Sequence, residues 1–436
     1  MSLTEVNKKI KERVFLVGVI TPGTDLQEYD ETVSELESLC ETANAVVVGK
    51  AVQKLNKINS ATFVGSGKLR EIIEQKDDLK FDTLVFNDNL SPSQARNIAE
   101  RAKCNVVDRT ELILDIFAQH ARTGQSRLQV ELAQLEYNYS RLRNMWQHLS
   151  RIEGVMGSKG PGEKQIELDR REIKKRIVIL KKRLKDIKKE TIIKRNKRKK
   201  YYNIAFVGYT NAGKSTLFNR LTGENIYADD KLFATLDSTA RKLYSKTGKK
   251  LVVSDTVGFI RKLPHQLISS FHSTLMEVTE ADMLIHVADI SQARVLDTIN
   301  AVENVLKEIN AWDIPTLTVF NKSDLLTGLK PAFLKKKLKT MYPDSVFISA
   351  KYDETINAVT EAIEKAVNRL NQCAELKVPA DMGGLISFIH ANSEVSEKEF
   401  CDKENAWIIK LRIEPDVLGN IKKQIEKHNV LKSIKS

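Results

Sequence analysis

The stretch Gly208-Tyr-Thr-Asn-Ala-Gly-Lys-Ser215 decides the fold of this 436-residue chain. Its spacing, G-x-x-x-x-G-K-S, is that of a phosphate-binding P-loop, and it lies between an apolar run at 203–207 and a helical stretch at 216–221. In such a loop, backbone N–H groups and a helix N-terminus face phosphate oxygens. We therefore expect Lys214 to reach the β- and γ-phosphates of a nucleotide and Ser215 to bind Mg²⁺. The residues expected to line the phosphates are Gly208, Tyr209, Thr210, Asn211, Ala212, Gly213, Lys214, Ser215 and Thr216.

A second motif, Asp255-Thr256-Val257-Gly258, follows the apolar run 251–254. A carboxylate at the end of a strand can hold the water shell of Mg²⁺, so we predict that Asp255 is a metal ligand through water. Gly258 can offer its N–H to a γ-phosphate. The D-x-x-G pattern is weak alone, but its position after a P-loop makes it specific.

A third motif, Asn321-Lys322-Ser323-Asp324, follows the apolar run 316–320 and predicts the choice of base. The carboxylate of Asp324 can accept hydrogen bonds from N1–H and the 2-amino group of guanine. Adenine offers neither donor and would leave the carboxylate unpaired, which costs several powers of ten in affinity. Ser349-Ala350-Lys351, after the run 346–348, is expected to close over the edge of the base.

A switch segment that senses the γ-phosphate is expected between the first two motifs. The segment Phe233-Ala234-Thr235-Leu-Asp-Ser-Thr239 lies in the expected window between the first two motifs. We choose Thr235 as the threonine that binds Mg²⁺ and the γ-phosphate, with Thr239 as second choice. The ordered motifs together are those of a Ras-like P-loop GTPase, and its predicted catalytic residues are Lys214, Thr235 and Gly258.

Two positions in these motifs bear on the rate of hydrolysis. Phe259 follows Gly258, where Ras-type proteins carry the glutamine that orients the attacking water. Phenylalanine cannot orient water, so we expect slow intrinsic hydrolysis that a partner or an ion accelerates. Asn211 stands where potassium-activated GTPases place an ion-ligating asparagine, which makes K⁺ a candidate cofactor beside Mg²⁺.

The composition fits a soluble intracellular protein. Apolar residues make up 42% of the chain, and no apolar run approaches the roughly 20 residues that a membrane span needs. The four cysteines are far apart and form no C-x-x-C pair, which argues against a zinc site and against disulfides. We expect a monomer in the cytoplasm without membrane insertion, and peripheral association with a membrane stays open.

The positive charge is concentrated in one segment. Residues 164–200 carry 18 Lys and Arg but only 5 Asp and Glu, a surplus as large as the net charge of +13 for the whole chain. Such a concentration favours an anionic polymer as partner, with nucleic acid first.

Four domains are expected, in an α/β fold class. Residues 1–125 alternate apolar runs with helical stretches and predict an α/β subdomain with a largely parallel sheet. Residues 201–370 repeat strand, loop and helix and form the GTPase domain, and 371–436 form a small α+β domain with a helix at 382–391, a strand at 407–413 and a helix after Pro415. Strands in the first subdomain are expected at 15–20, 45–50, 62–64, 83–86 and 105–108. The turn Gly65-Ser-Gly-Lys68 lacks the full P-loop spacing and is interpreted as structural.

Residues 126–200 predict a long basic helical hairpin. Apolar residues from Leu128 to Leu149, and again from Ile173 to Ile187, recur with alternating spacings of four and three. The glycine-rich stretch 154–162 between them predicts a non-helical tip, so the two helices should fold back as an antiparallel pair. This tip is longer than a turn requires, and we expect it to make a functional contact.

The chain resembles the HflX-type ribosome-associated GTPases. The resemblance rests on GSKGPGEKQIELDRR at 157–171, the P-loop GYTNAGKSTLFN, the switch FATLDST, and DTVGFI followed by RKLP at 261–264. It implies a GTPase that binds the large ribosomal subunit and its rRNA, with the hairpin reaching toward the peptidyl-transferase region. It also implies that binding and hydrolysis of GTP recycle or split stalled or stress-inactivated ribosomes.

Three alternatives stay open at this point. The chain could be a ribosome-assembly GTPase that never splits subunits, or a GTPase of tRNA modification. It could also be a GTP-switched regulator of a protein partner, with the hairpin as a protein-binding coiled coil.

Overall fold

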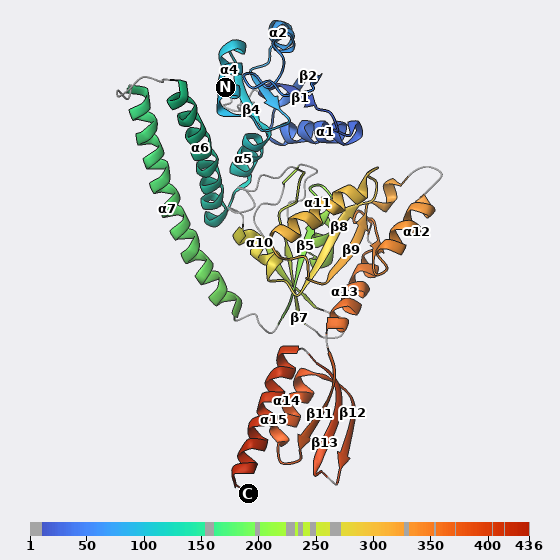
Figure 1. Ribbon diagram of the computed structural model, residues 1–436. Coiled ribbons are helices and arrows are strands. Elements are labelled where there is room, and N and C mark those ends of the chain that lie inside the picture. The colour runs from blue at the N-terminus through green and yellow to red at the C-terminus, as the bar shows by residue number, and fades with distance from the viewer. Residues whose placement is uncertain are drawn as a thin grey trace, which may run out of the picture. The chain divides into compact units, whose positions relative to one another are not determined.

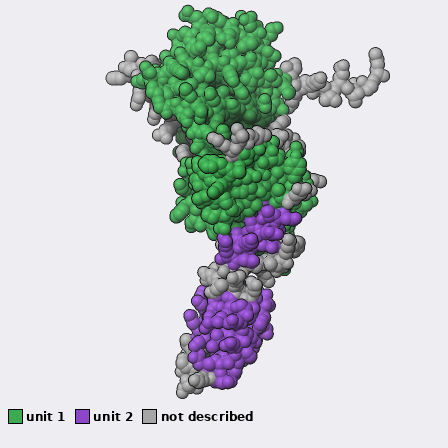
Figure 2. All heavy atoms as spheres, turned by 90° about the vertical axis from the view of Figure 1, so that its right-hand side faces the viewer, with its two compact units in different colours: residues 1–356 green, residues 357–436 purple. Residues whose placement is uncertain are grey.

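The computed structural model describes residues 11–152, 161–196, 201–223, 232–233, 239–244, 250–261, 272–326, 331–352, 355–370, 372–402, 404–413 and 415–435. The chain divides into two compact units, residues 1–356 and 357–436, shown in different colours in Figure 2. The predicted α/β class is confirmed, whereas the division into four domains stays a prediction. Among the described helices, none combines the length and the apolar character needed to cross a membrane.

The first unit begins with a fully parallel sheet in the order β2-β1-β3-β4. Successive residues of β1 face opposite cores: Phe15 and Val17 belong to one, and Val14 and Leu16 to the other. Burial on both faces explains why these strands appear in the sequence as apolar runs. The strands are β1 (Arg13–Ile20), β2 (Val46–Lys54), β3 (Thr83–Phe86) and β4 (Asn105–Asp108).

The helices of this part are α1 (Leu26–Thr42), α2 (Ser66–Glu74), α3 (Lys76–Leu79), α4 (Pro92–Ala102) and α5 (Arg109–His120). Helix α4 starts at Pro92, with a capping box between Ser91 and Gln94. The strand predicted at 62–64 is wrong. Phe63 forms only an isolated bridge with Asn59 and has a φ of 62°, so this apolar run is buried in a turn and pairs with no strand.

The basic hairpin consists of α6 (Gly124–Ile152) and α7 (Pro161–Asn196), which lie side by side in Figure 1. Leu132, Ile177 and Leu180 are buried in the seam between them, and the flanking heptad residues pack around these three. The predicted non-helical tip extended to residue 162, but α7 already begins at Pro161. Proline is tolerated at the first helical position because the N–H that it lacks has no partner there. The rest of the predicted tip, 154–160, lies outside the described residues.

The P-loop lies in a six-stranded sheet of order β10-β9-β8-β5-β7-β6, with only β6 antiparallel to its neighbour. Because the other strands are parallel, their carboxyl ends meet at one edge, where α/β proteins bind ligands. The strands are β5 (Tyr202–Gly208), β6 (Thr239–Tyr244), β7 (Lys250–Asp255), β8 (Met283–Asp289), β9 (Thr316–Asn321) and β10 (Val346–Phe347). The helices are α8 (Lys214–Thr222), α10 (His272–Thr279), α11 (Val295–Glu308), the 3₁₀ turn η1 (Ser323–Leu325) and α12 (Pro331–Met341).

The second unit contains a three-stranded antiparallel sheet of order β11-β13-β12. Its core unites apolar residues of the sheet and of both following helices, among them Val378, Ile389, Ile409 and Ile421. The elements are α13 (Ile356–Leu370), which begins at the boundary between the units, β11 (Gln372–Pro379), α14 (Gly383–Asn392), β12 (Glu394–Cys401), β13 (Ala406–Ile413) and α15 (Pro415–Lys435). The predicted helix, strand and final helix are present; β11 and β12 were not predicted.

Candidate nucleotide-binding site

The P-loop runs from Gly208, the last residue of β5, to Lys214, the first residue of α8. Gly213 has a φ of 89°, and a Cβ there would lie 2.2 Å from Nδ2 of Asn321. A side chain at this position would therefore be strained and would collide with the third motif. The loop conformation requires glycine where the sequence pattern places it.

Lys214 is buried at the centre of the site, and its Nζ donates to the carbonyl of Tyr209 at 2.8 Å. Burial lowers the pKa of Lys214 from 10.5 to about 8, while the charge of Asp255 acts in the opposite direction. The lowered pKa means that nearby negative charge does not fully offset the burial of the ammonium group. A phosphate group beside Lys214 would therefore favour its charged form. His286 on β8 is also buried, and burial together with Lys214 lowers its pKa to about 4, so its imidazole is neutral near pH 7.

The second motif lies against the P-loop. The hydroxyl of Ser215 donates to Oδ2 of Asp255 at 2.7 Å, which unites the two residues predicted to hold Mg²⁺. A Cβ on Gly258 would lie 2.9 Å from Nζ of Lys214, so only glycine lets the backbone approach this close. The N–H of Phe259 donates to the carbonyl of Gly208 at 3.0 Å, and the Phe259 side chain is buried in the apolar core. Phe259 thus anchors the loop and does not face a bound nucleotide.

Asn321 connects the base-recognition motif to the P-loop. Its Nδ2 donates to the carbonyl of Ala212 at 2.8 Å, and its Oδ1 accepts from the N–H of Ala350 at 2.8 Å. One side chain therefore fixes the first, third and last motifs relative to one another. Lys322 pairs with the buried Asp289 at 2.8 Å, and Asp324 lies exposed in η1.

The remaining predicted residues lie around this centre. Thr256 donates its hydroxyl to the carbonyl of Phe206, and Lys351 accepts at its carbonyl from Arg220 at 3.1 Å. The N–H of Ser323 donates to the carbonyl of Ile348, and the N–H of Ser349 donates to the hydroxyl of Thr355. Among the described residues, the structure brings together the first, second, third and last motifs. Further members of these motifs in the described part are Tyr209, Thr210, Asn211, Thr216 and Val257.

The switch segment is described only in part. Thr239 lies at the start of β6, opposite Asp255 in the strand register. The side chain of Phe233 is buried in the N-terminal core, where its ring meets that of Phe117 edge to face at a centroid distance of 4.6 Å. Ala234 and Thr235 lie outside the described residues, so their predicted roles stay predictions.

A network that the sequence did not predict joins the P-loop to helix α1. The hydroxyl of Tyr209 donates to Oε1 of Glu35 at 2.5 Å and accepts from the N–H of Arg261 at 2.7 Å. The other oxygen of Glu35 pairs with the buried Arg109 at 2.6 Å, and Arg261 pairs with Glu31 at 2.7 Å. Burial raises the pKa of Tyr209, so the hydroxyl stays protonated and can donate. The network links residues on both sides of the nucleotide motifs to the N-terminal sheet domain.

Comparisons with known proteins agree with this geometry. Residues 203–322 match the family model described as "50S ribosome-binding GTPase", and residues 30–118 and 120–198 match models of the N-terminal and middle regions of GTP-binding GTPases. GTPase HflX of Caldanaerobacter subterraneus subsp. tengcongensis is 41% identical over 395 residues, covering 90% of this chain and 89% of the relative. GTPase HflX of Escherichia coli is 40% identical over 385 residues, covering 88% and 90%.

Among solved structures, a GTP-binding protein of Sulfolobus solfataricus in complex with GDP is 27% identical, with a TM-score of 0.45 and coverage of 83% of this chain and 100% of that chain. The relatives at about 40% identity extend over about nine tenths of the chain. Together with the assembled P-loop site, they show that the chain belongs to the HflX family of GTPases and hydrolyses GTP.

Proposed function

We propose that this GTPase binds the large ribosomal subunit through rRNA and uses GTP binding and hydrolysis to split or recycle stalled or stress-inactivated ribosomes. It would act as a monomer in the cytoplasm. The observation that carries the proposal is the basic hairpin attached to the same compact unit as the P-loop. The description of the family model for residues 203–322 points to the same partner.

The cationic face of the hairpin is suited to RNA phosphates. Lys174, Lys175, Lys182 and Lys185 on α7 are exposed, and among the described residues none of them forms an ion pair with a carboxylate. Exposed, unneutralised lysines release counterions when they meet phosphates, which supplies affinity without sequence preference. Specificity would then come from the shape of the pocket that the tip enters.

The residues of the P-loop site have separate roles in hydrolysis. Lys214 would hold the β- and γ-phosphates, and Asp324 would select guanine. Ser215 and Asp255 supply a hydroxyl and a carboxylate in contact with each other, a donor set that fits Mg²⁺ shared with substrate phosphates. Bound there, Mg²⁺ would neutralise charge on the phosphates, with Thr235 as the proposed third protein ligand. The N–H of Gly258 would meet the γ-phosphate.

Slow basal turnover follows from the position of Phe259. Its side chain is apolar and buried in the core, so it cannot orient the attacking water. We propose that the ribosome completes the site.

Potassium is a further proposed activator, because Asn211 is an exposed P-loop residue with a left-handed φ of 56°. Hydrolysis is expected to be faster in potassium chloride than in sodium chloride at equal ionic strength. Equal rates in the two salts would show that potassium does not activate hydrolysis.

Co-sedimentation with purified large subunits tests the proposed partner. The full-length protein should pellet with large subunits in a non-hydrolysable GTP analogue and much less in GDP, and the subunits should raise steady-state GTP hydrolysis. If the protein stays out of the pellet with either nucleotide, a ribosomal role is rejected and a protein partner is favoured. Binding without any effect on assembled ribosomes would favour ribosome assembly, and binding to tRNA alone would favour tRNA modification.

A further inference from the structure

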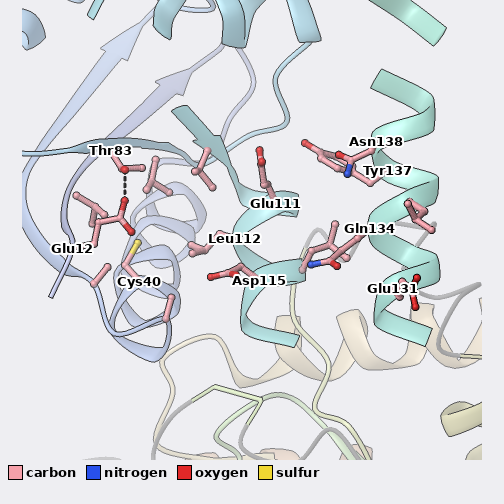
Figure 3. A pocket seen from close by; sticks show the side chains of 17 residues that line it. Glu12, Cys40, Thr83, Glu111, Leu112, Asp115, Glu131, Gln134, Tyr137 and Asn138 are labelled. Carbon is pink, nitrogen blue, oxygen red and sulfur yellow. Dashed lines mark hydrogen bonds between the residues drawn. The ribbon is translucent and has the colours of Figure 1, made fainter. Parts of the chain in front are cut away.

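A cavity of about 480 Å³ lies between the N-terminal sheet and the first helix of the hairpin (Figure 3). Residues of β1, β3, β4 and α1 form one side, and residues of α5 and α6 form the other. This volume is in the range of sites for small organic molecules. The cavity is distant in the sequence from the nucleotide motifs, and none of their residues lines it.

The lining combines apolar walls with negative charge. Among the described residues that line the cavity there are four carboxylates and no lysine, arginine or histidine, in a chain whose net charge is +13. The apolar walls are formed mainly by Val14, Val85, Val107, Leu112, Leu114 and Leu135. This lining favours a ligand that carries positive charge and also presents apolar surface.

Two of the four carboxylates are already neutralised by arginines. Glu111 pairs with Arg141 at 3.3 Å, and Glu131 pairs with Arg176 at 2.7 Å. Burial raises the pKa of Glu111, so a further cation nearby would favour its charged form.

The other two carboxylates have only neutral donors. Glu12 accepts a hydrogen bond from the hydroxyl of Thr83, and Asp115 accepts one from Nε2 of Gln119 at 2.8 Å. Neither has a cationic partner in the part of the chain that the structure describes. Both therefore have acceptor capacity left for an ammonium group.

The arrangement of these carboxylates selects the shape of the cation. Glu12 precedes β1 and Asp115 lies on α5, and Figure 3 shows Cys40 and Leu112 between them. No group of three or more potential ligands that could hold a metal ion occurs among the described residues. A compact ion therefore does not match this site, whereas an elongated cation can reach both carboxylates across the apolar floor.

We propose that this cavity binds an aliphatic polyamine, whose terminal ammonium groups pair with Glu12 and Asp115 while its methylene chain packs against Leu112. Ammonium groups retain full charge at neutral pH, and charge-assisted hydrogen bonds to carboxylates are the strong ones. Because the cavity is lined by α6 as well as by the sheet, the bound polyamine braces the hairpin against the N-terminal domain.

Isothermal titration of the free full-length protein with spermidine, at constant ionic strength, tests this assignment. We expect saturable one-to-one binding that Mg²⁺ at equal charge concentration does not abolish. Asp115 is exposed, so Asp115→Asn should leave the fold intact and weaken binding by about tenfold, the loss of one charge-assisted pair. Asp115→Lys, which supplies an ammonium group of its own, should abolish binding.

The matched control is Glu37→Gln, which removes an acidic side chain of α1 that pairs with Lys50 and does not line the cavity. This variant should bind spermidine like the wild type, and guanine-nucleotide binding should be equal in all variants as a check of folding. Absence of saturable binding to the wild type overturns the assignment. So does unchanged affinity in both Asp115 variants, because the polyamine would then bind elsewhere on the protein.

Discussion

At the residue scale, Asn321 and Asp324 divide the work of the third motif. Asn321 is buried and hydrogen-bonds both the P-loop and the loop of Ala350. Asp324 is exposed and available to a base. The two neighbouring roles predict different consequences of substitution: loss of Asn321 should loosen the whole site, whereas changing Asp324 should alter only the base that is preferred.

Asp324→Asn is expected to shift preference from guanine toward xanthine nucleotides. The amide places a donor where the carboxylate accepted, so the 2-amino group of guanine meets a like partner. Affinity for GDP should fall by about a hundredfold or more, because the 2-amino group of guanine loses its acceptor. Fluorescence titration with GDP and xanthosine diphosphate measures the change. Asp313→Asn, in the exposed loop before β9, should bind GDP normally, and an equal loss in that control would contradict the assignment.

At the element scale, helix α1 contacts the nucleotide site through Tyr209. The phenol hydroxyl joins Glu35 of α1 to the backbone of Arg261, which directly follows the second motif. Phe233 of the switch segment is buried in the same N-terminal core. The P-loop and the predicted switch segment are therefore both held by contacts with the N-terminal domain.

Tyr209→Phe removes one hydroxyl from this network and keeps the carbonyl that Lys214 contacts. The hydroxyl makes two hydrogen bonds, each worth about 1 kcal/mol, so releasing the restraint should raise basal GTP hydrolysis by at least about fivefold with little change in GDP affinity. Single-turnover hydrolysis measures this, and Glu37→Gln on the exposed side of α1 is the control. A lower rate in Tyr209→Phe would mean that the network assembles the site and does not restrain it.

The hairpin is expected to supply salt-dependent affinity. Neutralising Lys174, Lys175, Lys182 and Lys185 to glutamine removes four exposed cations from α7 without touching the buried seam. Each lost phosphate contact should reduce the log–log salt slope of ribosome binding by roughly 0.7 to 0.9. Co-sedimentation across a salt series gives the slope. The control variant, with glutamine at Lys336, Lys337, Lys422 and Lys423, should keep the salt slope of the intact protein. If the two variants have equal slopes, the hairpin is not the RNA-binding element.

Sequence patterns predicted some of these elements better than others. The parallel strands are apolar runs because both faces are buried, and β3 and β4 match the predicted ranges. Strands β11 and β12 were missed because one face is polar: in β12, charged residues such as Glu397, Lys398 and Glu399 obscure any apolar run. The P-loop spacing located the nucleotide site without the structure. The contact of Glu35 with Tyr209 could not be predicted from the sequence. The two residues are 174 positions apart, and no sequence motif contains both of them.

At the scale of the whole molecule, the N-terminal sheet, the basic hairpin and the P-loop sheet belong to one compact unit of residues 1–356. The hydrogen bond of Tyr209 to Glu35 and the burial of Phe233 in the N-terminal core connect the nucleotide motifs to the domain that carries the hairpin. The hairpin in turn ends at a glycine-rich segment, 154–162, that the proposed function places inside the ribosome. The proposed function therefore assigns binding to the charge of the hairpin and separation of subunits to its tip, and we expect the two to be separable.

The most direct test is the dissociation of assembled ribosomes, followed by light scattering, with a variant in which residues 154–162 are shortened to a minimal turn. The intact protein with a non-hydrolysable GTP analogue should separate the subunits, and GDP should not support separation. The shortened variant should bind ribosomes and guanine nucleotides nearly as well, because the α7 lysines and the P-loop are unchanged, yet it should fail to separate subunits. If the shortened variant separates ribosomes at the rate of the intact protein, the hairpin is only a tether and the account is contradicted.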